Sequence, residues 1–494
     1  APAAAPDPAP VADTTPLGTT AGFPRRVPVP VLRPPLDQCV PTGVALERGA
    51  RVVLMPDDGG VGAALARQVT KLGVEVLQID GAPDARTLEE QIAGWLADGP
   101  VTGVYWLPAL DDEGPLQDLD PEAWHEGLRR RVKLLAVTMR ALPGTPFLVA
   151  ATRLGGRFGY DAAGAASVMG GAVSGFTKAF ARERTDALVK VVDLAASRKT
   201  TAFAELLVDE TQRDPGAVEI GYADALRWTV GLADEPATDD PAHALGADTT
   251  FLVTGAAGSI VAAITADLAT ASGGTFHLVD LVEAPDPADA DIAAFGADRD
   301  ALKGVLADRM RGRGEKPTPK LVERDLARIE RAAAALEAIH AIESAGGAPP
   351  RPRCAPTAAA QAAPVTRAVV ETSGRVDVLL HCAGLEISHF LPDKPQVEYD
   401  LVFDVKADGW FHLLHGLGEA GPSAAVVFSS IAGRFGNAGQ TDYAAANDLL
   451  CKSVSRMRRD GVRGIAIDWT AWAGIGMASR GSIPKMMELA GIDM

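Results

Sequence analysis

Short apolar runs alternate with amphipathic segments along most of the chain, which is the pattern of an α/β protein. Apolar runs of strand length lie at 51–56, 74–80, 102–110, 146–152 and 188–194, and helix-like periodicity lies between them at 62–73, 122–142 and 171–184. A strand, a helix and a second strand over 51–80 predict a βαβ unit, whose strands are parallel. The first half of the chain is therefore expected to form a parallel sheet covered by helices.

The same cycle starts again after an acidic, proline-containing stretch. Strands are predicted at 249–255, 275–281, 376–384, 423–430 and 464–469, and helices at 260–272 and 443–459. Two cycles of similar order indicate an internal duplication, so we expect an α/β fold of two Rossmann-like, doubly wound subdomains. The predicted organisation is a linker at 1–24, a first subdomain at 25–235, a linker at 236–249 and a second subdomain at 250–494.

Composition narrows the range of functions. With 494 residues and 47% hydrophobic content, the chain can bury more than one core. The net charge of −17 disfavours binding to nucleic acid or to an anionic membrane. Arginine runs at 129–131 and 456–459 are interpreted as solvated helix faces, with docking of an acidic partner as the alternative. No apolar run reaches the length of a membrane span.

The cysteines and the first residues indicate the compartment. Cys39, Cys354, Cys382 and Cys451 lie far apart and form no CxxC motif, so neither a zinc site nor a disulfide framework is predicted. The histidines are scattered, and no metal-ligand cluster is expected. The Ala/Pro/Thr-rich start lacks the features of a signal peptide and is expected to be an extended linker. These observations favour a cytoplasmic protein.

Four polar residues in the second half suggest a catalytic set. Lys406, Ser430, Tyr443 and Asn447 are spaced 24, 13 and 4 residues apart. A phenol delivers a proton near neutral pH only if its pKa of about 10 is lowered, which a nearby ammonium and a hydroxyl partner can do. Each residue alone has an ordinary structural explanation, but together they indicate hydride transfer to a carbonyl. Ser429 is the adjacent alternative, and the 13-residue spacing selects Ser430.

A dinucleotide site is predicted upstream of this set. The segment TGAAGSIV at 254–261 follows a strand and opens a helix, which is the context of a phosphate-binding turn. Asp280 ends the next strand, where a carboxylate accepts hydrogen bonds from a ribose 2′-hydroxyl and favours NADH. The alternative interpretation is a solvated strand end. The candidate cofactor-binding residues are Thr254, Gly255, Ala257, Gly258, Ser259, Ile260, Asp280, Leu281, Cys382, Ala383, Gly384, Lys406 and Tyr443.

The segments FSSIAG at 428–433, YAAAN at 443–447 and DWTAWAGIGMA at 468–478 resemble the ketoreductase domain of a polyketide synthase or polyunsaturated fatty-acid synthase. Such domains are short-chain dehydrogenase/reductase folds that pair an inactive structural copy with a catalytic copy. The resemblance implies reduction of a 3-oxoacyl thioester, delivered by an acyl carrier protein, with NADPH. Tyr443 would be the proton donor, Ser430 a hydrogen-bond donor, and Lys406 would lower the tyrosine pKa or anchor the ribose.

Further roles follow from the same resemblance. Asn447 would hold the relay water or the lysine, and the HCAG segment at 381–384 would line the nicotinamide. The partners would be the carrier protein and other synthase domains, with a homodimer formed through the parent synthase. The end of the chain resembles the start of a mobile lid helix, so an excised piece of a larger synthase is expected.

The chain departs from the family pattern at several cofactor positions. Val261 replaces the last glycine of the loop, Asp280-Leu281 replaces a small residue followed by arginine, and Ala355-Pro356 replaces an Asp-Val pair. The choice between NADPH and NADH therefore stays open. An NAD-dependent alcohol dehydrogenase and a catalytically silent scaffold are the alternatives.

The first half lacks the catalytic set. Ala166 falls at the place of Tyr443, and Gly170 at the place of Asn447. Its glycine turn at 56–62 contains Asp57 and Asp58, whose charges would repel a pyrophosphate. A structural role is therefore favoured for this turn.

Substrate selection is less clearly encoded. Phe435 stands eight residues before Tyr443, where family members of one stereochemical type carry tryptophan, and Glu386-Ile387-Ser388 replaces the acidic motif of the other type. The tryptophan type is therefore favoured, with Phe435, Gln440 and Met477 as candidate substrate residues. An insertion at about 285–365 is interpreted as solvated helices, with a partner-binding or oligomerisation element as the alternative.

Overall fold

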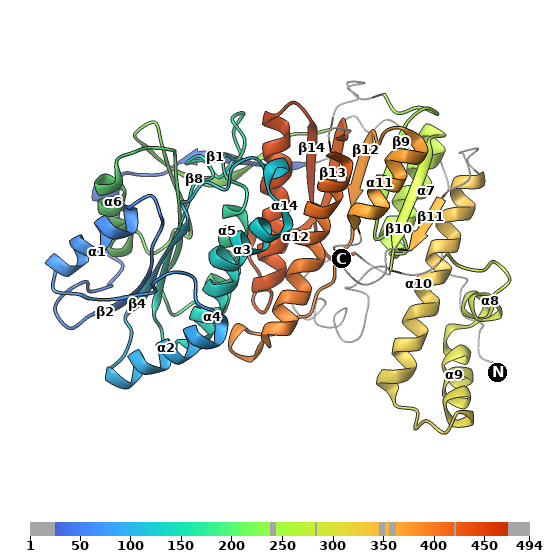
Figure 1. Ribbon diagram of the computed structural model, residues 1–494, viewed down its shortest axis with the longest axis horizontal. Helices are drawn as coiled ribbons and strands as arrows, with labels where there is room; N and C mark the ends of the chain where they lie inside the picture. The colour runs from blue at the N-terminus through green and yellow to red at the C-terminus, as the bar shows by residue number, and fades with distance from the viewer. Residues whose placement is uncertain are drawn as a thin grey trace, which may run out of the picture.

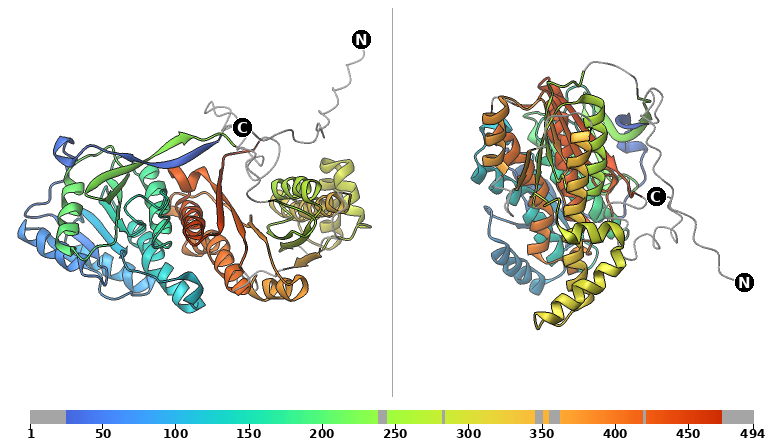
Figure 2. Two further views of the ribbon diagram at one scale, coloured as in Figure 1. Left: turned by 90° about the horizontal axis from the view of Figure 1, so that it is seen from above. Right: turned by 90° about the vertical axis from the view of Figure 1, so that its right-hand side faces the viewer.

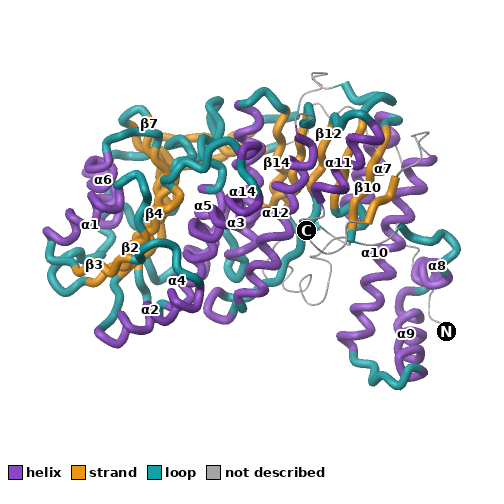
Figure 3. Tube along the Cα trace, viewed as in Figure 1, coloured by secondary structure: helices purple, strands orange, loops and turns teal. Residues whose placement is uncertain are grey.

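The computed structural model describes residues 25–237, 244–281, 284–344, 351–354, 362–418 and 421–472, with only the backbone described for 351–354. These residues form two sheets that lie side by side and are separated by helices (Figures 1 and 3). Met477, Ala355, Pro356 and the expected lid helix lie outside the described residues.

The first sheet has eight strands in the order β1-β8-β7-β6-β5-β4-β2-β3. β2 to β7 are parallel, and β8 runs antiparallel to both β7 and β1. The strands are β1 (Arg26–Leu32), β2 (Arg51–Met55), β3 (Glu75–Gln78), β4 (Gly103–Ala109), β5 (Phe147–Thr152), β6 (Val189–Leu194), β7 (Glu219–Ala223) and β8 (Leu226–Asp234). The helices are α1 (Val61–Lys71), α2 (Ala85–Asp98), α3 (Pro121–Leu128), α4 (Leu134–Ala141), α5 (Gly170–Glu183) and α6 (Thr200–Gln212).

Apolar side chains cover both faces of this sheet. α1 and α6 pack on one face, while α2, α4 and α5 pack on the other. The parallel strands β2, β4, β5 and β6 are buried along their whole length, which explains their continuous apolar runs in the sequence.

The second sheet has six parallel strands in the order β11-β10-β9-β12-β13-β14. The strands are β9 (Thr250–Thr254), β10 (Thr275–Asp280), β11 (Arg351–Cys354), β12 (Val378–His381), β13 (Ala424–Ser430) and β14 (Arg463–Trp469). The helices are α7 (Ser259–Ser272), α8 (Ala290–Ala297), α9 (Arg299–Gly312), α10 (Pro319–Ser344), α11 (Ala362–Ser373), α12 (Gln396–Leu417), α13 (Ile431–Phe435) and α14 (Thr441–Arg459). Counted along the chain, this is the 3-2-1-4-5-6 order of a doubly wound Rossmann sheet, and the order reverses between β9 and β12.

The predicted fold class is confirmed. The first sheet repeats the order β10-β9-β12-β13-β14 of the second sheet in β3-β2-β4-β5-β6, and it has no counterpart of β11. In the first half, five elements, β1, β7, β8, α2 and α6, were not predicted from the sequence. The predicted domain boundaries stay predictions, although the described residues between β8 and β9, 235–237 and 244–249, belong to neither sheet.

Two interpretations of charged segments were wrong. α10 is not a solvated helix, because eight of its residues are buried and its C-terminal part packs with α7 over the second sheet. Its N-terminal part and α9 project beyond the sheet (Figure 1) and share a small apolar core. The run at 129–131 is a π-helical segment between α3 and α4, where Arg131 is buried and its guanidinium donates to the carbonyl oxygen of Asp111.

The two halves share one core. A single apolar cluster joins β2, β4 and β5 of the first half to α12 and α14 of the second. α5 lies directly beside α14, as the views in Figures 1 and 2 agree. A Cβ atom on Gly175 would lie 2.2 Å from the Ala444 carbonyl oxygen, so glycine permits this close helix packing.

Candidate functional site

The four candidate catalytic residues lie at the carboxyl-terminal side of the second sheet. Ser430 is the last residue of β13, Tyr443 lies in the first turn of α14, and Asn447 follows one turn later. Lys406 projects from the middle of α12, the helix after β12. Ligands of doubly wound sheets bind at this side, next to the point where the strand order reverses.

The lysine and the tyrosine are both buried. The Lys406 ammonium donates to the Phe428 carbonyl oxygen at 2.7 Å, and its Nζ atom lies 5.9 Å from the centre of the Tyr443 ring. Burial lowers the pKa of Lys406 to about 8. Burial also raises the pKa of Tyr443 to about 12, against the lowering effect of hydrogen bonds with Asn447 and Ser430. The lowered phenol pKa that was expected for proton delivery is therefore not found in this structure.

The two neighbouring serines have different surroundings. Ser430 caps α13, where its Oγ atom accepts from the Ala432 amide at 3.1 Å, and its hydroxyl reaches Tyr443. Ser429 is buried on the other side of the strand and contacts α14 through Cys451 Sγ at 3.1 Å. The geometry therefore places Ser430, and not Ser429, beside the phenol.

Asn447 is fully buried in α14. Its Nδ2 atom donates to the Tyr443 carbonyl oxygen at 2.8 Å. Its Oδ1 atom has no hydrogen-bond partner among the described residues. A buried acceptor of this kind is costly unless something binds to it, which fits a water or an ammonium held beside Tyr443.

The loop after β12 is organised by Thr254 and His381. Thr254 Oγ1 accepts from the amides of Cys382 and Ala383 at 3.2 and 3.3 Å and lies 2.9 Å from His381 Nδ1. His381 Nε2 lies 3.1 Å from the Lys406 carbonyl oxygen, so this nitrogen carries the proton and the Thr254 hydroxyl donates to Nδ1. Burial lowers the pKa of His381 to about 3, which keeps the ring neutral. A neutral imidazole thus joins β9, β12 and α12.

His381 was not among the predicted site residues. Its segment was expected only to line the nicotinamide. The bridging role was missed because nothing in a sequence identifies a buried ring that joins two distant elements.

The glycine loop is shaped for a close approach. Gly255 has φ +68°, and a Cβ atom there would lie 2.9 Å from the Ala383 amide nitrogen. Gly258 is the N-cap of α7, and Ser259 and Ile260 are the first two residues of this helix. Glycine has no side chain that could accept hydrogen bonds from the amides of the first turn. The Asp280 carboxylate accepts from the Ala257 amide at 2.9 Å and from the Leu281 amide at 2.7 Å, so it also holds the loop in shape.

The corresponding turn in the first half is closed by its own side chain. Asp57 accepts from the Val61 and Gly62 amides at 3.1 and 2.6 Å, at the start of α1. Asp58 pairs with Arg130 at 2.6 Å. A carboxylate thus occupies the helix start that an anion would need, which agrees with the structural role favoured for this turn.

Two of the candidate substrate residues, Phe435 and Gln440, lie at the two ends of the segment that joins α13 to α14. Leu385 and Ile387 pack against the apolar cluster of Val402, Ala432 and Tyr443, and the negative charge of Glu386 acts to raise the pKa of Tyr443. Gln440 immediately precedes α14 and donates to Ser388 Oγ at 3.2 Å. Phe435 is 41% exposed at the end of α13.

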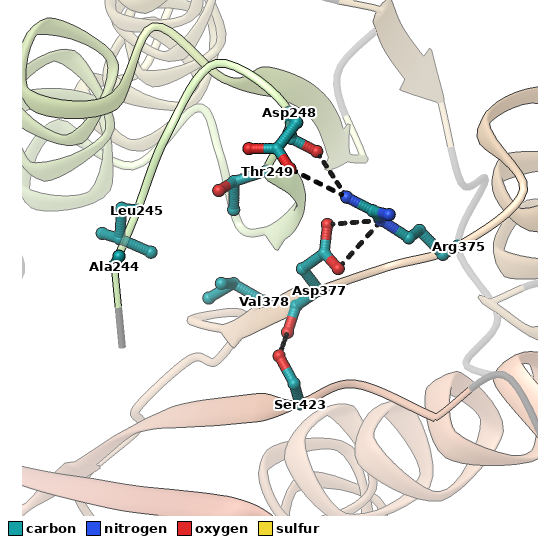
Figure 4. Close-up of a pocket in the computed structure, with 8 residues that line it drawn as sticks. All are labelled: Ala244, Leu245, Asp248, Thr249, Arg375, Asp377, Val378 and Ser423. Atoms are coloured by element: carbon teal, nitrogen blue, oxygen red, sulfur yellow. Dashed lines mark hydrogen bonds and ion pairs between the residues drawn. The ribbon is translucent and has the colours of Figure 1, made fainter. Parts of the chain in front are cut away.

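A cavity of about 260 Å³ lies at the opposite edge of the sheet (Figure 4). There Arg375 lies between Asp248 and Asp377, at 3.5 and 3.0 Å, before β9 and β12 begin. The polar groups that line the cavity already pair with one another, and the cavity lies at the amino ends of the strands. It is therefore not part of the candidate active site.

Two further kinds of site are missing from the described part of the chain. No group of three His, Cys, Asp or Glu residues there is placed to hold a metal ion. Within the same residues, no helix combines the length and apolarity that crossing a membrane requires.

Comparison with known proteins identifies the second half. Residues 249–474 match the family model of the KR domain. The chain is 28% identical over 346 residues to a component of the polyunsaturated fatty acid synthase of Thraustochytrium sp., and 29% identical over 459 residues to polyketide synthase GfsA of Streptomyces halstedii. These alignments cover 67% and 90% of this chain, but only 12% and 5% of the relatives.

The fold has close counterparts among solved structures. A structure of A-type ketoreductases from a modular polyketide synthase superposes with a TM-score of 0.64 at 20% identity, covering 95% of this chain and 87% of that chain. Residues 249–474 therefore match the KR domain family, and the chain has the fold of solved ketoreductase domains.

Proposed function

We propose that this chain reduces the 3-oxo group of an acyl thioester to a 3-hydroxy group with NADPH, as the ketoreductase domain of a larger synthase. The observation that carries the proposal is the meeting of Ser430, Tyr443, Lys406 and Asn447 at the carboxyl-terminal side of a Rossmann sheet. This set combines a proton donor, a second hydrogen-bond donor and a buried cation.

The residues around the glycine loop fit a dinucleotide. The backbone of Gly255 approaches the loop after β12, and the start of α7 offers amides for a phosphate. When bound, the reduced nicotinamide supplies the hydride. Cys382, Ala383 and Gly384 would line its ring, and Lys406 would hold the ribose. Asp280 leaves NADH as an alternative, because a carboxylate there favours a free 2′-hydroxyl.

The chain's own residues handle the proton. In the proposed mechanism Ser430 donates a hydrogen bond to the substrate carbonyl oxygen, and Tyr443 transfers its proton to that oxygen as negative charge develops. The ammonium of Lys406 stabilises the tyrosinate that remains. A water held by the Oδ1 atom of Asn447 would then return a proton toward Tyr443.

The proposed substrate is delivered on an acyl carrier protein domain of the same synthase. The support is that the matched relatives are much longer synthases, of which this chain spans only a small part. Contacts with other synthase domains and a dimer formed through the parent synthase belong to this proposal.

The test follows the absorbance of NADPH and of NADH with a short 3-oxoacyl thioester. We expect Tyr443→Phe to lower kcat by roughly 10² to 10⁴-fold, because the proton donor is lost. Tyr399→Phe is the matched control, since its hydroxyl is buried without a hydrogen-bond partner among the described residues. Its rate should equal that of the wild type. A folded wild type that consumes neither cofactor would instead support a silent scaffold, and alcohol-dependent reduction of NAD alone would support a dehydrogenase.

A further inference from the structure

Two loops border Tyr443 on its substrate side. One loop, residues 382–390, follows β12 and carries Glu386 and Ile387. The other loop, residues 436–440, joins α13 to α14 and carries Gln440. The first loop packs against the apolar cluster that contains Tyr443, and the second loop ends three residues before Tyr443. The spacing of the two loops would therefore affect how a ligand approaches the phenol.

The last turn of α5, in the half without the catalytic set, contacts both loops. Glu183 ends this helix, and its Oε2 atom accepts from the Leu391 amide at 2.9 Å. Its Oε1 atom accepts from the Gly439 amide, also at 2.9 Å. One carboxylate therefore holds a backbone amide at the end of the first loop and one within the second. Hydrogen bonds to an ionised acceptor are stronger than neutral ones.

Other contacts hold the second loop against α5. Arg182 Nε donates to the Phe435 carbonyl oxygen at 3.2 Å. A Cβ atom on Gly436 would lie 2.2 Å from the Lys178 carbonyl oxygen, so the loop follows the helix backbone closely. Between the loops, the His389 amide donates to the Gly439 carbonyl oxygen at 3.0 Å. A continuous chain of contacts thus connects Glu183 with the residues around Tyr443.

A buried ion pair fixes the base of the same assembly. Lys394 Nζ contacts the two carboxylate oxygens of Asp442 at 2.7 and 2.6 Å and donates to the Ile387 carbonyl oxygen at 2.8 Å. Asp442 directly precedes Tyr443 and accepts its backbone amide at 2.8 Å. The ion pair and Glu183 thus hold the two loops at different points: the pair at Ile387 and Asp442, and Glu183 at the amides of Leu391 and Gly439.

We propose that Glu183 is a positioning residue that sets the gap between these loops, and thereby which face of a 3-oxoacyl thioester is presented to Tyr443. The substrate named here rests on the proposed function, whereas the clamp rests on the contacts of Glu183 alone. The half without catalytic residues would thus contribute directly to selectivity.

The experiment uses the full chain with Glu183→Gln. Glutamine keeps one acceptor oxygen, but its NH₂ group cannot accept, so one of the two amides loses its partner. We expect hydrogen–deuterium exchange in peptides covering 385–391 or 436–440 to become roughly tenfold faster. With a 3-oxoacyl thioester and NADPH, the ratio of the two alcohol configurations should fall and KM should rise more than kcat falls.

Glu113→Gln is the matched control. Glu113 is a buried carboxylate that, like Glu183, accepts a backbone amide, that of Met169 at 3.2 Å, but it contacts neither loop. Its variant should leave exchange in the loops and the alcohol ratio at wild-type values.

Each outcome decides a separate part of the proposal. Unchanged exchange in both loops of Glu183→Gln would overturn the clamp, whether or not the protein is active. Faster exchange with an unchanged alcohol ratio and KM would overturn the role in selectivity. A wild type inactive toward every thioester would refute the proposed function and with it the role in selectivity, while exchange would still decide the clamp.

Discussion

The buried ammonium of Lys406 makes the proposed proton transfer sensitive to alkaline pH. Its pKa is lowered to about 8, so the charged form that stabilises a tyrosinate is present below this pH and is lost as the pH rises through it. We expect kcat/KM for ketone reduction to fall above pH 8 with the loss of one proton. A pH–rate profile between 6 and 10 measures this.

An arginine at the same position provides the control. The guanidinium of Lys406→Arg stays charged over this range, so its profile should be flat above pH 8, at a lower absolute rate. A wild-type rate that is constant up to pH 10 would contradict the assignment of the alkaline limb to Lys406.

At the scale of elements, the loop after β12 and helix α12 meet at Gly384. A Cβ atom there would lie 2.6 Å from Lys406 Cε and 3.1 Å from Nζ. We expect Gly384→Ala to push the ammonium away from the Phe428 carbonyl oxygen and to lower kcat/KM by roughly 100-fold. Steady-state kinetics measure this effect, and thermal unfolding shows whether the fold persists.

Gly216→Ala is the comparison for this loop substitution. A Cβ atom on Gly216 would have no neighbour within 4 Å, so activity and Tm should stay near the wild-type values. Wild-type activity in Gly384→Ala would show that Lys406 has room to move without losing its function.

At the scale of the whole molecule, buried charges join the two halves. Lys178 of α5 contacts the Asp448 carboxylate at 2.9 Å, and Lys452 of α14 contacts it at 3.2 Å. Burial would raise the pKa of Asp448, but these two cations lower it to about 2. Asp448 directly follows Asn447, so this pairing also holds the catalytic helix against the first half.

Replacing Lys178 tests this coupling. Lys178→Met leaves the buried Asp448 with Lys452 as its ion-pair partner, and we expect the free energy of unfolding to fall by about 3 kcal/mol. Chemical denaturation should show one cooperative transition in both proteins, because the halves share a core. Arg86→Met removes an exposed ion pair with Glu90 and should change stability little. Separate transitions for the two halves in the wild type would contradict the shared core.

Much of the fold was predictable because its central strands are parallel and buried on both faces. Such strands appear as continuous apolar runs, and the helices between them carry one apolar stripe. β1 and β8 were missed because β1 is the edge strand and β8 lies next to it, and partly exposed side chains and the prolines of β1 interrupt the pattern. α10 was misread because its charged residues conceal a buried face.

The sequence by itself determined the chemistry that is available: the spacing of Lys406, Ser430, Tyr443 and Asn447, the glycine loop, and the loss of the tyrosine in the first half. These features are local, since each depends on residue types at short separation within one repeat. The tertiary structure alone decided the rest. It buried Lys406 and Tyr443 enough to shift both pKa values, and it made His381 a neutral bridge. It also brought Glu183 to loops 208 and 256 residues away, because such contacts arise only when the two halves of the chain pack together.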